Sequence, residues 1–352
     1  MRLYIHVPFC RSKCGYCDFC SGPDRGLKVD YLAALSAEIR GRAGERVFSS
    51  VYIGGGTPSL LSPDELAGLL RGLRLEPGAE VSIESNPEDV TPETLAAWKD
   101  LGINRISVGI QSLNEAELGA LGRRLSLGES RQALDLLSRR WGNWSVDLIT
   151  GMNGQTEETL RRTLEEVIRH GPPHLSLYAL ETKPESRVQP QEPDRVADLL
   201  LAAWRLLADR GYRHYEISNF RRPGFECRHN LGYWHRGEYF GCGASAHSFL
   251  DGVRYWNTPD VEDYVERMRR GACPVEGEDR MTKREAQWEA MMLGLRLEEG
   301  VVEGAGDSEN LGILESEGWI RRADGRLALT ESGMMVFNDL ALALRAALIE
   351  NR

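Results

Sequence analysis

Residues 3–17 read Leu3-Tyr4-Ile5-His6-Val7-Pro8-Phe9-Cys10-Arg11-Ser12-Lys13-Cys14-Gly15-Tyr16-Cys17. The first five predict a β-strand, and three cysteines with the spacing Cys-x3-Cys-x2-Cys follow it almost at once. Thiolates are the usual protein ligands of a cubane iron–sulfur cluster, which holds four irons. The spacing therefore predicts a [4Fe–4S] cluster bound by Cys10, Cys14 and Cys17, with one iron left open to a small molecule.

Two other interpretations of the cysteines were weighed against this cluster. A structural zinc ion prefers four protein ligands, usually as two Cys-x-x-Cys pairs, which this stretch lacks. Cys20 would close the cluster if it were a fourth ligand, and the protein would then be an electron carrier. We expect Cys20 not to be a ligand, because the polar strand ends described below would otherwise have no purpose.

Outward from the cysteines, short β-like runs alternate with helical runs over the first two-thirds of the chain. Strand, helix and strand recur about every 30 residues, which predicts βαβ units and a parallel sheet. Six repeats are too few for a closed eight-unit barrel, so we expect a curved α/β partial barrel of six units with ligands at the carboxyl ends of its strands. The predicted strands are Leu3–Val7, Val51–Ile53, Val81–Glu84, Arg105–Ile110, Val146–Ile149 and Leu175–Leu180, and the predicted helices are Val29–Arg42, a helix capped by Ser62, Pro92–Leu101, Glu129–Arg140, Glu157–His170 and Asp194–Arg210.

Polar residues lie at the ends of these strands. The run Gly54-Gly55-Gly56-Thr57-Pro58 ends the second strand and lacks the Lys-Ser/Thr ending of a phosphate-binding loop. Asp147 is embedded in an apolar strand, where a carboxylate is costly without partners. When Asp147 is considered alone, a core carboxylate that is hydrogen-bonded inside the protein explains it equally well. The whole array favours a ligand with amino, carboxylate and hydroxyl groups, and its other members are Glu84, Gln111 and Arg123.

The cysteine spacing straight after a first strand resembles the signature of the radical S-adenosylmethionine (SAM) superfamily, and the strand ends are similar to those of its coproporphyrinogen dehydrogenase and haem chaperone group. This resemblance implies reductive cleavage of SAM at the open iron and an electron donor such as a flavodoxin or ferredoxin. It also implies that Tyr4 packs by the cluster and that Arg123 binds the methionyl carboxylate. The remaining SAM contacts that it implies are Gly55, Gly56 and Thr57 for the amino group, Gln111 and Asp147 for the ribose, Glu84 for the methionyl and ribose region, and Tyr178 and Leu180 for the adenine.

Two functions compete within this group. The stretch His229-Asn230-x-x-Tyr233-Trp234 resembles the haem-associated motif of HemW-type haem chaperones, which implies that the protein binds haem through His229 and passes it to an acceptor protein. Oxygen-independent coproporphyrinogen III dehydrogenase is the alternative. The motif of that enzyme resembles Cys-x3-Cys-x2-Cys-x-Cys, whereas Phe19 stands at the position of the last cysteine here. That enzyme also carries an N-terminal extension, whereas nine residues precede Cys10 in this sequence. The motifs favour the chaperone.

The same region allows two further interpretations. Cys227, His229, Cys242 and His247 have spacings that could together bind one metal ion. His229 could equally be a core histidine whose ring nitrogens are satisfied inside the protein. Neither interpretation needs haem.

The C-terminal part has a different pattern. Residues 274–279 resemble a linker. Two helices, at Lys283–Leu297 and Glu309–Glu317, precede a hairpin with the turn Ala323-Asp324-Gly325, and a last helix spans Met334–Ile349. This order predicts a small α+β, winged-helix-like domain with a packing role. We expect three parts, residues 1–222, 223–275 and 276–352.

Composition limits the partners. Lys and Arg number 43 against 53 Asp and Glu, giving a formal net charge of -10, and no basic run is present, so we expect no nucleic acid partner. No apolar run has the length of a membrane span, and the N-terminus lacks a signal-peptide pattern. Four of the seven cysteines lie within residues 10–20, which indicates metal ligands in a reducing compartment. We expect a cytoplasmic protein.

Overall fold

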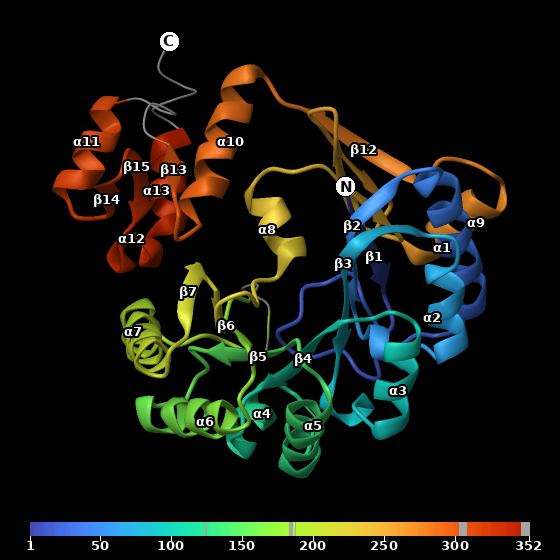
Figure 1. Ribbon diagram of the computed structural model, residues 1–352, viewed down its shortest axis with the longest axis horizontal. Helices are drawn as coiled ribbons and strands as arrows, with labels where there is room; N and C mark the ends of the chain where they lie inside the picture. The colour runs from blue at the N-terminus through green and yellow to red at the C-terminus, as the bar shows by residue number, and fades with distance from the viewer. Residues whose placement is uncertain (124, 183–185, 187, 303–307, 346–352) are drawn as a thin grey trace.

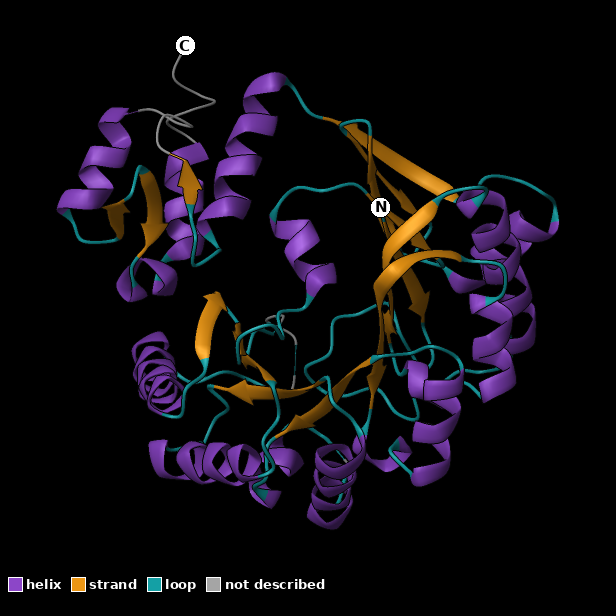
Figure 2. Ribbon diagram, in the orientation of Figure 1, coloured by secondary structure: helices purple, strands orange, loops and turns teal. Residues whose placement is uncertain are grey.

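The fold is that of a computed structural model, which describes all residues except 124, 183–185, 187, 303–307 and 346–352. A large twisted sheet carries helices on its outer face, and a smaller helical part lies across its open side (Figure 1, Figure 2). The helices are α1 (Lys28–Ala43), α2 (Pro63–Leu70), α3 (Pro92–Asp100), α4 (Glu115–Ala120), α5 (Leu127–Arg140), α6 (Glu157–Arg169), α7 (Pro193–Asp209), α8 (Arg228–Trp234), α9 (Val261–Arg269), α10 (Lys283–Leu295), α11 (Ser308–Ser316), α12 (Glu331–Met335) and α13 (Phe337–Arg345), with 3₁₀ turns η1 (Pro58–Leu60) and η2 (Pro87–Asp89).

Six parallel strands form the predicted partial barrel. They are β1 (Arg2–Val7), β2 (Val47–Gly55), β3 (Arg74–Ser85), β4 (Arg105–Gln111), β5 (Trp144–Thr150) and β6 (His174–Ala179), hydrogen-bonded in sequence order. This confirms the six βα units. Ser62 caps α2 through a capping box with Glu65, as its position before Pro63 predicts.

The sheet continues beyond the six strands on both sides. Next to β6 lie β8 (Asn219–Arg221) and β7 (Arg213–Glu216), and next to β1 lie β9 (Tyr239–Cys242), β10 (His247–Leu250), β11 (Val253–Asn257) and β12 (Val275–Arg280). The linker interpretation of residues 274–279 is wrong, because β12 pairs antiparallel with β11. The sheet also runs across the predicted boundary at residue 222, since β9 to β11 belong to the predicted connecting region.

The two faces of the barrel strands differ in chemistry. Residues that alternate along each strand, such as Ile5, Ile53, Ile83 and Ile106, align across the sheet and are fully buried against the outer helices. The intervening residues face the barrel interior and are mostly polar. They include Tyr4, Tyr52, Ser82, Glu84, Arg105, Ser107, Gly109, Ser145, Asp147, His174, Ser176 and Tyr178. A polar interior beside an apolar outer layer is what a ligand-binding barrel requires.

The C-terminal part has its own hydrophobic core, which includes Met292, Leu295, Leu327 and Leu340. Its sheet holds β13 (Val301–Val302), β15 (Arg326–Leu329) and β14 (Ile320–Ala323). The predicted hairpin is confirmed, and its turn residues Asp324 and Gly325 have φ of 52° and 71°, as a two-residue turn of this kind requires. Helices α10 and α11 precede the hairpin as predicted, but β13 between them was not predicted. The last helix, predicted over Met334–Ile349, is divided into α12 and α13, and its residues 346–349 lie outside the described residues.

Candidate functional site

A cavity of about 1190 Å³ lies inside the barrel, at the carboxyl ends of its strands. Its lining extends from the cysteine loop after β1 to β8 and to the C-terminal helices. Twelve of the fourteen predicted site residues line it, while Tyr4 and His229 do not. The twelve are Cys10, Cys14, Cys17, Gly55, Gly56, Thr57, Glu84, Gln111, Arg123, Asp147, Tyr178 and Leu180. We call the part near β1 to β5 the SAM end.

Backbone hydrogen bonds close the cysteine loop on itself. The N–H of Cys10 donates to the carbonyl of Gly22 at 2.9 Å, and the N–H of Gly22 donates to Pro8 at 2.9 Å. Within the loop the N–H of Cys17 donates to the carbonyl of Cys14 at 3.2 Å. The Cys20 thiol donates to the carbonyl of Pro259 at 3.1 Å and does not line the cavity. This arrangement supports the prediction that Cys20 is not a ligand.

The glycines after β2 permit contact between two loops. A Cβ atom on Gly56 would lie 2.7 Å from the carbonyl oxygen of Phe9 and 2.9 Å from Cys10 Sγ, closer than real Cβ atoms come. The N–H groups of Gly56 and Thr57 donate to Val7 and Phe9, each at 2.8 Å. The N–H groups here are therefore used within the protein, and what remains for a ligand is oxygen acceptors, which suits an ammonium group.

Glu84 and Asp147 bring two carboxyl groups into the interior. Glu84 accepts from the Tyr52 hydroxyl at 3.0 Å and from the Gly55 N–H at 3.1 Å, while the Ser107 hydroxyl donates to Asp147 at 3.0 Å. Burial, with the nearby Asp147 charge as a second cause, raises the pKa of Glu84 to about 7. Burial also raises the pKa of Asp147. A cationic ligand would relieve this crowding of negative charge.

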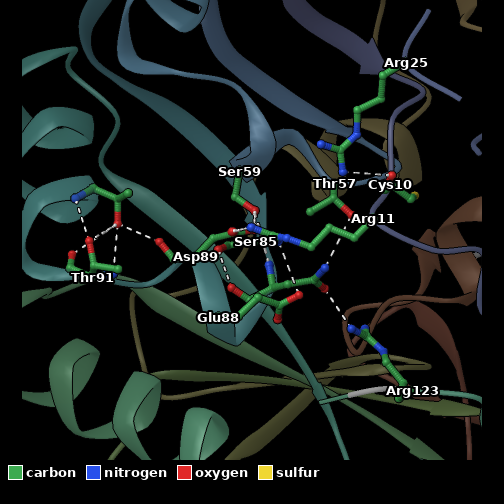
Figure 3. Close-up of polar contacts among 12 residues, drawn as sticks. Cys10, Arg11, Arg25, Thr57, Ser59, Ser85, Glu88, Asp89, Thr91 and Arg123 are labelled. Carbon is green, nitrogen blue, oxygen red and sulfur yellow. Dashed lines mark hydrogen bonds and ion pairs between the residues drawn. The ribbon is translucent and has the colours of Figure 1, made fainter. Parts of the chain in front are cut away.

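Arg123 supplies positive charge at the same end. Its Nη1 donates to Asn86 Oδ1 at 2.8 Å, and Asn86 Nδ2 lies 3.4 Å from Thr57 Oγ1 (Figure 3). Among the described residues its buried Nε has no hydrogen-bond partner. A buried guanidinium with a free N–H is suited to an anionic group such as a carboxylate. Asn86 was not predicted, because an amide after a strand is a common turn residue.

Gln111 is held in an unusual backbone conformation. Its φ is 67°, a region that costs a residue with a side chain about 1–2 kcal/mol. A Cβ atom on Gly109 would lie 2.9 Å from Gln111 Nε2 and 3.0 Å from Arg123 Nη2. The glycine therefore leaves room for both side chains at the end of β4.

A further ion pair ties the cysteine loop to the third strand end. Arg11 forms ion pairs with Glu88, at 3.3 Å, and with Asp89, while the Ser59 hydroxyl donates to Asp89 at 2.6 Å (Figure 3). Arg11 lies between the first two cysteines and is nearly half exposed. These contacts were not predicted, since nothing in the sequence pairs residue 11 with residue 89.

Tyr4 lies in different surroundings from Tyr178 and Leu180, the predicted contacts to the adenine. The Nε2 of His6 must donate to the carbonyl of Cys20, at 2.8 Å, so its Nδ1 accepts from the Tyr4 hydroxyl, at 3.0 Å. Tyr4 thus contacts the cysteine loop through His6. Tyr178 is 41% exposed and Leu180 is buried, both at the cavity wall.

His229 does not reach the cavity. Its side chain is 1% exposed, its Nδ1 is bonded to Ser50 Oγ at 2.9 Å and its Nε2 to the Tyr233 hydroxyl at 2.7 Å. Burial lowers its pKa to about 3. In this arrangement both ring nitrogens are hydrogen-bonded inside the protein, which agrees with the core-histidine interpretation, and haem ligation by His229 stays a prediction. Its neighbours Asn230 and Trp234 do line the cavity.

The mononuclear metal site is also not formed. Cys242 is buried, His247 is exposed and stacks on Trp256, and the Cys227 thiol donates to Glu80 at 3.6 Å. In the part of the chain that the structure describes, no three His, Cys, Asp or Glu side chains gather around one metal-ion position. The cluster cysteines line the cavity without converging on a single point.

The geometry of the site and the comparisons with known proteins together define the class of protein. A family model described as the radical SAM superfamily matches residues 4–167, and with the cysteine loop and strand ends it makes this a radical SAM protein. Membership implies a [4Fe–4S] cluster and SAM. The thiols, the acceptors after β2 and the free Nε of Arg123 fit these groups.

The particular family follows from similarity over nearly the full length. The chain is 35% identical to a protein of Mycobacterium tuberculosis, over 97% of this chain and 94% of that relative, and 31% identical to one of Bacillus subtilis, over 96% and 97%. Both are named "Heme chaperone HemW", and the chain belongs to this family. The structure of HemN, the coproporphyrinogen III oxidase of Escherichia coli, aligns with a TM-score of 0.86 at 21% identity, over 99% of this chain and 90% of that one, which shows a shared fold.

Among the described residues, no helix combines the length and apolar character needed to cross a bilayer.

Proposed function

We propose that this protein is a haem chaperone that binds haem and delivers it to an acceptor protein. One observation carries the proposal: the 35% identity to HemW extends over 94% of that relative and so covers the C-terminal part as well as the barrel. We further propose a flavodoxin or ferredoxin as electron donor and a reducing compartment, the cytoplasm, where the cysteines stay unpaired.

The SAM end has a defined set of roles in this proposal. Cys10, Cys14 and Cys17 hold the cluster, and Arg123 receives the methionyl carboxylate. Cluster and SAM together supply one-electron chemistry when they are bound. Asp147 and Gln111 hold ribose hydroxyls, and Glu84 accepts from the cationic part of the ligand.

The coproporphyrinogen dehydrogenase activity is the alternative, because the fold is shared with HemN. At 21% identity that similarity concerns the fold. Phe19 stands where the resemblance to that enzyme requires a further cysteine. Haem transfer is therefore the first activity to test.

The test starts from protein with its cluster reconstituted without oxygen. Haem is titrated and followed by the Soret band, and the loaded protein is then mixed with a haem-free acceptor such as apo-myoglobin. Saturable one-to-one binding with transfer supports the chaperone. Absence of saturable binding, together with turnover of coproporphyrinogen in the presence of SAM and a reductant, would replace it with the dehydrogenase.

A further inference from the structure

The cavity has a second end, remote from the cysteine loop along the sheet. It lies where β7, β8 and α7 meet α8 and the C-terminal helices α12 and α13 (Figure 1). Leu297 forms a backbone bridge with Glu216, so the C-terminal part is fastened to the barrel beside this end. We call it the aromatic end. Its lining includes Leu200, Trp204, Ile217, Trp234, Arg296, Met334, Met335 and Phe337.

The walls of the aromatic end suit a flat apolar ligand. Two indoles, a phenyl ring and two thioethers come from four different elements, and indole and phenyl faces favour stacking on a π-system. The complete cavity, at about 1190 Å³, is larger than the roughly 300–1,000 Å³ typical of sites for one small molecule. It therefore has room for a second ligand besides SAM.

Three N–H groups at this end lack partners. Within the described residues, the buried Trp204 Nε1, Trp234 Nε1 and Arg296 Nε have no hydrogen-bond acceptor. An unpaired buried donor is unfavourable. All three residues line the cavity, so side chains with unused hydrogen-bonding capacity lie at this end.

Arg296 is the charged member of this group. Its guanidinium lies 4.3 Å from the centre of the Trp234 ring and 5.2 Å from that of Phe337. Glu216 is the nearby carboxylate, but its Oε2 is 3.7 Å from Arg296 Nη2, and it already accepts from Ser218 and Asn219. The guanidinium is thus partly buried against apolar rings, and among the described residues its ion pair with Glu216 is long, so an incoming anion would improve its surroundings.

We propose that the aromatic end binds the macrocycle of haem and that Arg296 receives one of its carboxylates. This inference rests on the proposed haem chaperone function and names the site, in place of His229. The rings of Trp204, Trp234 and Phe337 cover the macrocycle. The thioethers of Met334 and Met335 border the same space.

The test compares haem with haem dimethyl ester, whose carboxylates are blocked. Arg296→Met keeps an apolar stem over Trp234 and Phe337 but removes the donors. We expect it to weaken haem binding about ten- to a hundredfold, because a hydrogen bond to a charged group contributes about 1.5–3 kcal/mol. The ester should bind wild type and Arg296→Met with similar, weak affinity. Exposed Arg222, which stacks on Tyr212 outside the cavity, gives the matched control Arg222→Met, with unchanged haem binding.

The outcomes separate the inference from the function beneath it. If wild type binds haem and Arg296→Met binds it equally well, the site is wrong and the chaperone function stands. If wild type binds no haem, the function itself fails. Loss of binding in His229→Ala with a retained fold, but not in Arg296→Met, would restore the histidine and overturn this proposal.

A second variant covers the case in which Arg296→Met does not fold. Trp204→Phe replaces the indole by a smaller ring, which covers less of the macrocycle. We expect it to weaken haem binding about three- to tenfold, the size of the loss when one aromatic contact is reduced. Trp98→Phe, in the core away from the cavity, is the control and should leave haem affinity unchanged. Equal affinity of Trp204→Phe and wild type would count against the site.

Discussion

The SAM end and the aromatic end belong to one cavity but are built in opposite ways. At the SAM end the carboxylates of Glu84 and Asp147 are already hydrogen-bonded by the protein and are fixed by strands, and Arg123, in a loop, keeps an unpaired Nε. At the aromatic end Trp204, Trp234 and Arg296 leave N–H groups unpaired. The contrast suggests that the first end is preorganised for a small polar cofactor, whereas the second completes its contacts only when a large ligand arrives.

The largest test of this contrast removes a cluster ligand. Cys14→Ala should lose the cluster's iron and visible absorbance almost completely, since two thiolates hold a cubane poorly. Haem binding at the aromatic end should persist, which a Soret titration checks. Cys20→Ala is the matched control and should keep the cluster. Equal loss in both variants would make Cys20 a ligand, and loss of haem binding in Cys14→Ala would show that the two ends are not independent.

The pH dependence of the protein without its ligands tests Glu84. Its pKa in the folded state is about 7, above the ordinary 4.5, so the unfolded state loses this proton first as the pH rises. The contribution of Glu84 to the free energy of unfolding is therefore fully present below pH 4.5. It is lost as the pH rises through 7, and the total loss is at most about 3 kcal/mol. Glu84→Gln should therefore gain stability relative to wild type between pH 5 and pH 8, as measured by urea unfolding.

The control for this measurement lies on the same strand. Glu76 is exposed, so Glu76→Gln should show the same pH dependence as wild type. If the stability of Glu84→Gln and of wild type changed with pH in the same way, the pKa of Glu84 would not be raised in the folded protein.

Arg123 tests whether SAM recognition can be separated from the cluster. Arg123→Ala should weaken SAM binding about ten- to a hundredfold, because it removes a charge-assisted bond worth about 1.5–3 kcal/mol. Equilibrium dialysis measures the affinity, and the cluster absorbance should be unchanged. The exposed Arg131, which pairs with Glu166 on the outer surface, gives the control Arg131→Ala. Loss of the cluster in Arg123→Ala would contradict the carboxylate role.

Gly56 tests the close contact between two loops. Gly56→Ala places a methyl group 2.7 Å from the carbonyl of Phe9, and overpacking of this kind costs about 1–3 kcal/mol. We expect a lower thermal midpoint and less iron after reconstitution. Gly68→Ala in α2 meets no atom within 4 Å and should instead stabilise by about 0.5–1 kcal/mol. Equal behaviour of the two variants would remove the steric argument.

The two ends also differ in how far sequence predicts them. Residues of the SAM end follow strands directly, so strand position alone predicts that Gly55, Glu84, Gln111 and Asp147 meet at one edge of the sheet. Arg296, Met335 and Phe337 lie in the C-terminal part, and no pattern links them to Trp204. Tertiary packing alone brings them together.

The same distinction applies to the region around His229. A histidine beside Tyr and Trp has the composition of a haem site, but the sequence does not show which face of α8 each residue occupies. His229 turns toward Ser50 of β2, while Asn230 and Trp234 reach the cavity. The sequence also did not predict that β9 to β12 continue the sheet beyond β1. These strands are short and lie in a stretch rich in turn residues, so they show no clear strand pattern.

The two hydrophobic cores carry a consequence for thermal unfolding. Trp204 belongs to the barrel core and Phe337 to the C-terminal core, so a ligand at the aromatic end contacts both. Met334 packs against both cores, so the two parts are already coupled without it. Ligand binding adds its free energy only to the state in which both cores are folded, which raises the temperature of their joint unfolding. Release of the ligand to an acceptor would remove that free energy and lower the unfolding temperature of both parts together.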